Sequence, residues 1–222
     1  MLAMASLMIV SCNKEEDPAM TEEQAADYIE TSISSSDGGF NEELRKVVEL
    51  AYAEYENNCS YTGDTTFTSE YNGVRSYNYT STMDWFVTCD GLAVSSITFN
   101  LNKTGNYEGP RLTRQGTTTG SITISDLLNT TSYTANGSLT SNGSAEFTGV
   151  KNNVSTTMSS SMTLSNLSVN KTSYEIESGA ASVQIDATGN SNSASFNASV
   201  TFNGGGSADI TINGTTYSIT IR

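Results

Sequence analysis

The sequence Ser193-Ala194-Ser195-Phe196-Asn197-Ala198-Ser199-Val200-Thr201-Phe202 alternates strictly between polar and apolar side chains. Successive side chains of a strand point to opposite faces of its sheet, so this period of two predicts a β-strand with one buried face. The same alternation recurs along the chain, at Tyr77 and Tyr79; Met83, Trp85, Val87 and Cys89; Ile97, Phe99 and Leu101; Ile122 and Ile124; Val183, Ile185 and Ala187; Ile210 and Ile212; and Tyr217, Ile219 and Ile221. From Cys59 onward the chain is therefore predicted to form an antiparallel sheet.

Turn signals separate these strands, namely Asn72-Gly73, Asp90-Gly91, Asn142-Gly143, Gly204-Gly205-Gly206 and Asn213-Gly214. Asn-Gly and Asp-Gly favour tight hairpins because both central residues of such a turn need a positive φ. No long helical pattern interrupts the strands, which leaves no room for the crossovers that parallel strands require. We expect about ten antiparallel strands that follow one another as a meander.

Two helices are predicted before the sheet. The pattern Thr21-Glu22-Glu23-Gln24 is typical of a capping box and predicts a helix over residues 21–34. A second helix is predicted to begin near Asn41 and to end by residue 57, because one face is apolar at a period of 3.6 residues. That stripe is made of Leu44, Val47, Val48, Ala51, Tyr52 and Tyr55, and the other side carries Glu42, Glu43, Arg45, Lys46, Glu49, Glu54 and Glu56.

The expected helices are too small to hide the whole apolar face of the expected sheet. Lying side by side, each about 21–25 Å long, they would cover a strip about 20 Å wide. Ten strands at a spacing of about 4.8 Å make a sheet about 48 Å wide. The sheet must therefore either curl on itself or line an open cavity. We expect a mainly β fold: a curved meander, half-barrel or barrel-like, over residues 58–222, with the helical pair of residues 21–57 packed on it.

Composition excludes some function classes. The net charge is −14 and the pI is about 4.2, whereas nucleic-acid binding needs a basic surface. The charge is uneven, with a net of −10 over residues 13–57 and −4 over residues 58–222.

Aromatic residues gather in the first strands and are candidates for stacking on sugars or apolar ligands, although strands and cores use aromatics as well. They are Tyr61, Tyr71, Tyr77, Tyr79, Trp85 and Tyr107.

Catalytic candidates are few. The chain has no histidine, which removes serine–histidine and cysteine–histidine nucleophile pairs and histidine zinc sites. Ser168 and Lys171 have the Ser-x-x-Lys spacing of penicillin-recognising enzymes, but in the expected strands they point to opposite faces. Glu175 and Glu177 share a strand face and form the other candidate pair. We expect neither pair to be catalytic, no metal site, no cofactor and no enzyme activity.

The N-terminus resembles the signal peptide of a bacterial lipoprotein. A short apolar run ends in Ile9-Val10-Ser11-Cys12, and it is too short to span a membrane. The resemblance implies that residues 1–11 are a signal peptide, that Cys12 carries the diacylglyceryl thioether, and that residues 12–20 are a tether. No lysine or arginine precedes Cys12, unlike most such signals, so we expect the natural start to lie upstream of Met1.

The residues that follow Cys12 suggest where in the cell the protein is located. Lys14-Glu15-Glu16-Asp17 is similar to the acidic export signal of Bacteroidetes lipoproteins, which implies an outer-membrane lipoprotein exposed at the cell surface; a periplasm-facing protein is the alternative. The fold expected above resembles, in outline, half-barrel carriers of lipids or lipoproteins. We therefore expect a binding module for an apolar or glycan ligand; the alternative is a structural or adhesive surface protein without a small-molecule ligand. The lipid bilayer is the expected partner, through acylated Cys12.

The remaining cysteines, Cys59 and Cys89, form an even pair. In an exported protein such a pair predicts a disulfide, and the alternative is two buried thiols. Asp64-Thr65-Thr66 is similar to the Bacteroidetes O-glycosylation acceptor.

Overall fold

A computed structural model describes residues 19–54, 59–128, 130–148 and 154–221. Cys12 and the rest of residues 1–18 lie outside it. Two α-helices and a short 3₁₀ turn precede ten strands: α1 (Glu22–Ile33), η1 (Ser35–Asp37), α2 (Phe40–Glu54), β1 (Thr62–Tyr71), β2 (Ser76–Asp90), β3 (Ala93–Glu108), β4 (Leu112–Ser125), β5 (Ser132–Phe147), β6 (Val154–Asn170), β7 (Ile176–Thr188), β8 (Ser193–Gly204), β9 (Ser207–Ile212) and β10 (Thr215–Thr220).

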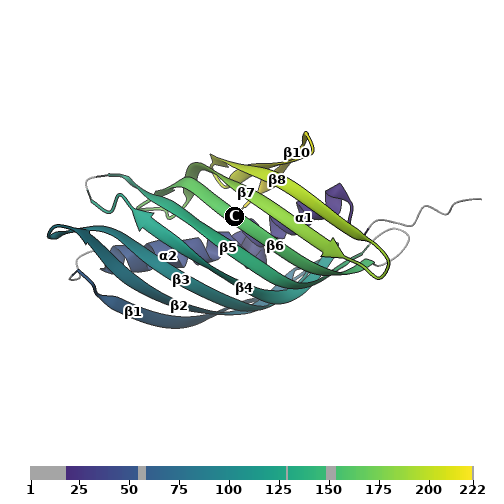
Figure 1. Cartoon of the computed structure of the whole chain (residues 1–222), viewed down its shortest axis with the longest axis horizontal. Helices are drawn as coiled ribbons and strands as arrows, with labels where there is room; N and C mark the ends of the chain where they lie inside the picture. The colour runs from purple at the N-terminus through teal and green to yellow at the C-terminus, as the bar shows by residue number, and fades with distance from the viewer. Residues whose placement is uncertain (1–18, 55–58, 129, 149–153, 222) are drawn as a thin grey trace, which may run out of the picture.

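The strands form one antiparallel sheet in the order β1 to β10, as the sequence predicts. The sheet is curved and does not close, because β1 and β10 are its two edges. Buried and exposed residues alternate along each strand, so that apolar side chains line the concave face and Ser, Thr and Asn cover the convex face. We call the concave face the trough (Figure 1).

The helices lie inside the trough and follow one another along the long axis of the molecule (Figure 1). The capping box at the start of α1 is confirmed, since the Thr21 side chain accepts from the Gln24 backbone amide while the Gln24 side chain accepts from Thr21 N–H. The segment 34–39, which includes η1, separates α1 from α2. End to end, the helices fill the length of the trough, which a side-by-side pair could not do.

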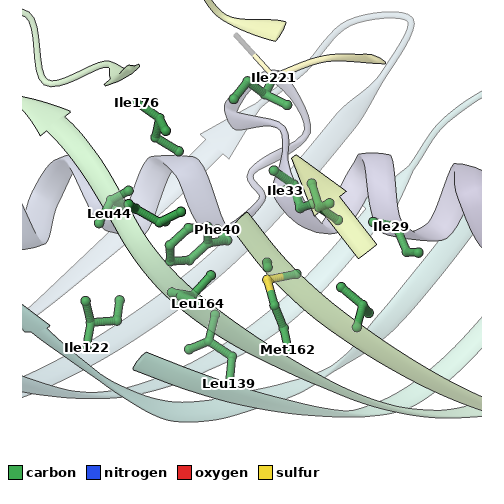
Figure 2. Packing of buried hydrophobic residues seen from close by; sticks show 14 of the residues in the cluster. Ile29, Ile33, Phe40, Leu44, Ile122, Leu139, Met162, Leu164, Ile176 and Ile221 are labelled. Carbon is green, nitrogen blue, oxygen red and sulfur yellow. The ribbon is translucent and has the colours of Figure 1, made fainter. Parts of the chain in front are cut away.

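Apolar side chains of the helices fill the trough. Ile29, Ile33 and Leu44 have no exposed surface and Phe40 is 3 % exposed. Figure 2 shows these side chains directed toward residues of the sheet such as Leu139, Met162 and Leu164. The sequence analysis indicates that two helices are too small to cover the apolar face of a flat sheet. The sheet curls around the helices instead, and this buries the apolar residues of the trough.

Glycines allow the sheet to curl. Gly105, Gly116 and Gly143 pair in one row across β3, β4 and β5, and a Cβ atom on any of them would lie 2.0–2.4 Å from a carbonyl oxygen of the neighbouring strand. Only glycine allows so close an approach. The turn predicted at Asn142-Gly143 is therefore wrong, because this dipeptide lies within β5 at the bend. The other predicted turns lie between strands.

The helices also connect the two edges of the sheet. On one edge, the Ser69 hydroxyl of β1 donates to the Glu42 carboxylate of α2. On the other, the Tyr217 hydroxyl of β10 donates to the Glu22 carboxylate of α1 over 3.3 Å. The Asn41 side-chain amide donates to the Ile221 carbonyl over 2.7 Å, which fixes the chain after β10 against the start of α2. The helical pair thus takes the place of the strands that would close a barrel.

Candidate functional site

A cavity lined by both polar and apolar side chains lies between the helices and the middle of the sheet. It has a volume of about 50 Å³, and a second cavity of about 30 Å³ adjoins it. We call the two together the central chamber. They share six lining residues, Tyr28, Tyr79, Lys103, Arg114, Thr118 and Ser141. On both sides of the chamber the trough is lined mainly by apolar side chains. In the chamber, charged and polar side chains join this lining.

Lys103 of β3 reaches into the chamber and pairs with α2. Its Nζ lies 2.6 Å from Glu43 Oε1, and both side chains are buried, at 8 % and 2 % exposed. Nζ also donates to the Gly38 carbonyl and lies 4.1 Å from the centroid of the Tyr79 ring. Burial raises the pKa of the Glu43 carboxyl and lowers that of the Lys103 ammonium, while each group's charge opposes the shift of the other. The ion pair fixes the start of α2 on the sheet.

Arg114 of β4 binds the end of α1. Its guanidinium donates to the Thr31 carbonyl over 2.7 Å and to the Ser32 hydroxyl over 2.8 Å. These acceptors belong to the last turn of the helix, where unpaired carbonyls and the helix dipole favour a cation. The guanidinium carbon also lies 5.8–6.0 Å from the ring centroids of Tyr28, Tyr79 and Tyr107. Three aromatic faces therefore stabilise its charge.

Two more arginines hold the helices outside the chamber. Arg75 pairs with Asp37 over 3.0 Å, and that carboxylate has no exposed surface. The hydrogen bond to Asp37 is the main reason that the pKa of Arg75 is raised. Arg111 pairs with Asp27 of α1 over 2.8 Å. The acidic N-terminal segment is therefore held by basic residues from the turns between strands, since Arg75 and Arg111 both bind its carboxylates.

The sequence pattern misplaces Glu43 and leaves the cations of the chamber unnoticed. The apolar stripe of α2 puts Glu43 on the solvent side, but the side chain is buried because Lys103 lies opposite it. The signal for Lys103 is present in the alternation, since Ile97, Phe99 and Leu101 all face the trough and residue 103 continues that series. A charged residue in register with three buried apolar ones predicts a buried ion pair.

The aromatic candidates do not form an exposed platform. Tyr79, Trp85 and Tyr107 are 3–6 % exposed and belong to the core. Tyr77 is partly buried against the core, with its ring centroid 5.9 Å from that of Tyr79, and Tyr71 next to it is 54 % exposed. Tyr61, just before β1, is 42 % exposed. Burial raises the pKa of Tyr107 to about 12. Most of the set therefore serves packing.

The two candidate catalytic pairs are not assembled. The Ser168 hydroxyl donates to Glu177, whereas Lys171 Nζ donates to the carbonyls of Asp126 and Leu127. The serine and the lysine thus serve separate contacts. Glu175 and Glu177 are both exposed, and Glu177 accepts from the hydroxyls of Ser132 and Ser168 and from Asn170, which lowers its pKa.

The cysteine pair is bonded. Cys59 and Cys89 form a disulfide with their Cα atoms 5.6 Å apart, which joins the chain before β1 to the end of β2. In the acceptor-like motif Asp64-Thr65-Thr66, Asp64 and Thr66 are exposed on the edge strand and Thr65 is half-buried. Among the residues that the structure describes, no three His, Cys, Asp or Glu side chains gather as metal ligands, and no helix has the length and apolar character to cross a bilayer.

An open hollow of about 600 Å³ lies over β3 to β6 and shares Gly105, Arg114, Gln115 and Ser144 with the second cavity of the chamber. Its lining is polar and includes Asn106, Thr113, Gln115, Ser144 and Glu146. No aromatic side chain lines it, so it lacks the stacking surface that a sugar site uses.

Comparison with known proteins gives no assignment. No protein-family model matches this chain, and neither a curated protein nor a solved structure matches it.

Proposed function

We propose that this chain is a non-enzymatic lipoprotein, anchored by Cys12 in the outer membrane and exposed at the cell surface, with a structural or adhesive role. The observation that carries the proposal is the filled trough. The cavities found between the helices and the sheet measure about 30–70 Å³, whereas ligand pockets measure about 300–1,000 Å³. A protein of this shape works through its outer surface.

Exposed apolar side chains outside the cavities support an adhesive role. Leu92, in the β2–β3 turn, is fully exposed, and Val74, in the β1–β2 turn, is 89 % exposed. Tyr52 at the end of α2 and Leu128 in the β4–β5 loop are 57 % and 46 % exposed. None of them lines the central chamber or the open hollow over β3 to β6. Apolar groups at the tips of turns favour contact with another macromolecule.

The second candidate, an apolar or glycan ligand in the trough, requires the helices to move. A ligand would have to displace Phe40 and Leu44 from sites in which they are 0–3 % exposed. It would also have to break the buried pair between Glu43 and Lys103. The apolar lining of the trough, from Phe99 to Ile210, is the feature that keeps this candidate open.

The start of α1 supports anchoring at one end of the molecule. Ala19 packs beside Gly189 of the β7–β8 turn, 3.5 Å from the position of a Cβ there. Only seven peptide steps separate Cys12 from Ala19 in the sequence. They span at most about 25 Å, so a lipid on Cys12 holds this end of the domain close to the bilayer. Two or three acyl chains make such an anchor stable.

Native mass spectrometry tests the proposal. The domain from Asn13 onward, purified gently, is expected to show only its own mass less the two hydrogens of the disulfide. A co-purified lipid or glycan mass would overturn the structural role in favour of the ligand-binding candidate. In parallel, the full chain expressed in a Gram-negative host with an alkyne fatty acid is expected to become labelled and protease-accessible on intact cells. A Cys12→Ala variant that is labelled as strongly would refute the anchor.

A further inference from the structure

The two edges of the sheet differ in length. The edge strand β1 has ten residues, whereas β10 at the other edge has six. β1 pairs with β2 from Thr62 to Tyr71 without a shift of register, and this stretch contains no proline. Proteins commonly protect a sheet edge with a short strand, a bulge or a proline. Within its own length β1 has none of these three protections, and it lies along the margin of the sheet in Figure 1.

Every second residue of β1 directs its backbone groups away from β2. The Val87 amide donates to the Tyr61 carbonyl over 2.9 Å, so the backbone of Tyr61 faces β2. Residues of an antiparallel ladder alternate between facing the partner strand and facing away from it. The odd-numbered residues from Gly63 to Tyr71 therefore bond to β2. The residues between them direct their N–H and C=O groups outward, and these are Thr62, Asp64, Thr66, Thr68 and Glu70.

The outward groups form a regular row of donors and acceptors. Each residue of the row supplies one N–H and one C=O. Within the part of the chain that the structure describes, no strand lies on this side of β1. The side chains of the same five residues are exposed. A further antiparallel strand could therefore bond to the whole row, as peptides do when they extend a sheet.

The charges of β1 suit a second copy of the same strand. Two antiparallel copies that overlap over the full strand place Thr66 opposite Thr66 of the second copy. In that register Asp64 lies opposite Thr68, and Glu70 lies opposite Thr62. Like charges directly opposite each other destabilise a pair of strands, and here no carboxylate faces another.

The same register pairs exposed aromatic rings. Tyr61 lies opposite Tyr71 of the second copy, and these side chains are 42 % and 54 % exposed in one copy. Both occupy positions without direct hydrogen bonds between the two copies, where side chains of neighbouring strands come closest. Cross-strand aromatic pairs stabilise a sheet. We propose that β1 is the interface of a homodimer, in which two copies pair edge to edge through antiparallel β1 strands centred on Thr66 and the two sheets become one.

The dimer separates the N-terminal ends of its two copies. Ala19 lies beside Gly189 of the β7–β8 turn, at the same end of the sheet as the β1–β2 turn, because successive strands of the meander alternate in direction. Since the two β1 strands are antiparallel, the Ala19 ends lie at opposite ends of the joined sheet. With the Cys12 anchor proposed above, such a pair suits copies that face each other from two membranes. This consequence rests on the proposed anchor, whereas the dimer does not.

The mass in solution tests the dimer without any membrane. Sedimentation velocity is applied to the chain from residue 13 onward, which contains every described residue. About 0.15 M salt screens the charge of −14 on each copy. Between about 10 µM and about 1 mM protein, the mass is expected to rise from that of one chain toward that of two, since a small interface binds weakly. The mass of a single chain at every concentration would overturn the proposal.

Thr68 tests the register. Thr68→Lys places an ammonium opposite Asp64 of the second copy and is expected to lower the Kd of the dimer about fivefold, while Thr68→Glu is expected to raise it about fivefold. Thr80→Lys is the matched control, because Thr80 is equally exposed and pairs with Thr68 from β2, one strand away from the interface. Its Kd is expected to stay within about twofold of the parent. Equal effects of Thr68→Lys and Thr80→Lys would contradict the interface.

The backbone row is tested at Thr66. Thr66→Pro removes an outward N–H and leaves the bonds to β2, so it is expected to raise the Kd at least about tenfold, whereas Thr66→Ala keeps the N–H and should stay within about threefold. In the parent, hydrogen exchange at the amides of Asp64, Thr66 and Thr68 is expected to slow as the protein concentration rises. A dimer in which these amides still exchange fast would use another surface and would overturn the proposal.

Discussion

The middle of the trough and its two apolar flanks stabilise the molecule in different ways. On the flanks, aliphatic side chains such as Ile97 and Ile210 have no exposed surface and pack through apolar contacts. In the middle, Lys103 and Arg114 bind particular acceptors on α2 and α1. Burial of apolar area is non-directional and would tolerate a helix that slides by a turn. The ion pair and the carbonyl contacts fix the position of the helices along the trough. The middle therefore determines where the helices bind, while the apolar flanks contribute most of the free energy of unfolding.

Breaking the ion pair in the middle should have the largest effect. Lys103→Met leaves the buried Glu43 carboxylate without its partner, and the free energy of unfolding is expected to fall by about 3–5 kcal/mol, measured by urea denaturation at pH 7. The double variant Glu43→Leu with Lys103→Met is expected to recover most of the loss because no unpaired charge remains. Lys46→Met is the control, since its pair with Glu49 is exposed and is expected to cost less than about 1 kcal/mol. Equal losses in all three variants would refute a special role for the middle.

A cavity on the flank should cost nearly as much. Leu44 has no exposed surface, and Leu44→Ala is expected to lower the free energy of unfolding by about 2–5 kcal/mol. The neighbouring exposed residue gives the control, with Arg45→Ala within about 0.5 kcal/mol of the parent. If Leu44→Ala behaved as Arg45→Ala does, α2 would not be part of the core.

Removing the disulfide tests the beginning of the sheet. Cys59 and Cys89 are 30 residues apart, and Cys59→Ser with Cys89→Ser is expected to lower stability by about 2–4 kcal/mol through the wider freedom of the unfolded chain. The reducing agent is the control, because it should destabilise the parent and leave the double variant unchanged. A parent unaffected under conditions shown to reduce its thiols would contradict the assignment of stability to this bond.

Neutralising Glu30 of α1 should have the smallest effect on the free energy of unfolding, and the effect should depend on pH. Burial is the main cause that raises the pKa of Glu30 above its ordinary value of 4.5, with Arg75 opposing it. The folded state thus binds the proton more tightly than the unfolded state, and charged Glu30 costs stability at neutral pH. Glu30→Gln is expected to gain about 0.5 kcal/mol at pH 7. The gain should shrink as the pH falls through the raised pKa and disappear below 4.5. A gain that grows in acid would show that Arg75 outweighs burial.

The sequence predicts the local structure well because that structure follows side-chain periodicity. The alternation from Ala194 to Phe202 became β8, and the stripe from Leu44 to Ala51 became the buried face of α2. Thr21 and Gln24 cap α1 as expected, because a capping box involves only near neighbours. Cys59 and Cys89 form the disulfide that the sequence analysis predicts for them.

Long-range pairing explains what the sequence did not reveal. Asn142-Gly143 has the composition of a turn, yet the pairing of Gly143 with Gly116 makes it a bend within a strand. Glu43 has the helical phase of a solvent-facing residue, and only the position of Lys103 on another element explains its burial. The central chamber likewise depends on residues from α1, β2, β3, β4 and β5, whose meeting no local pattern reports.

Hydrogen exchange on the folded domain tests the central claim that the helices are part of the core. The backbone amides of Leu44, Val47 and Val48 in α2 are expected to exchange as slowly as those of Phe99 and Leu101 in β3, because helix and sheet would unfold together. Helix amides that exchange orders of magnitude faster than the strand amides would contradict the claim. They would mean that the helices leave the trough while the sheet stays folded, and the trough would then be open to a ligand.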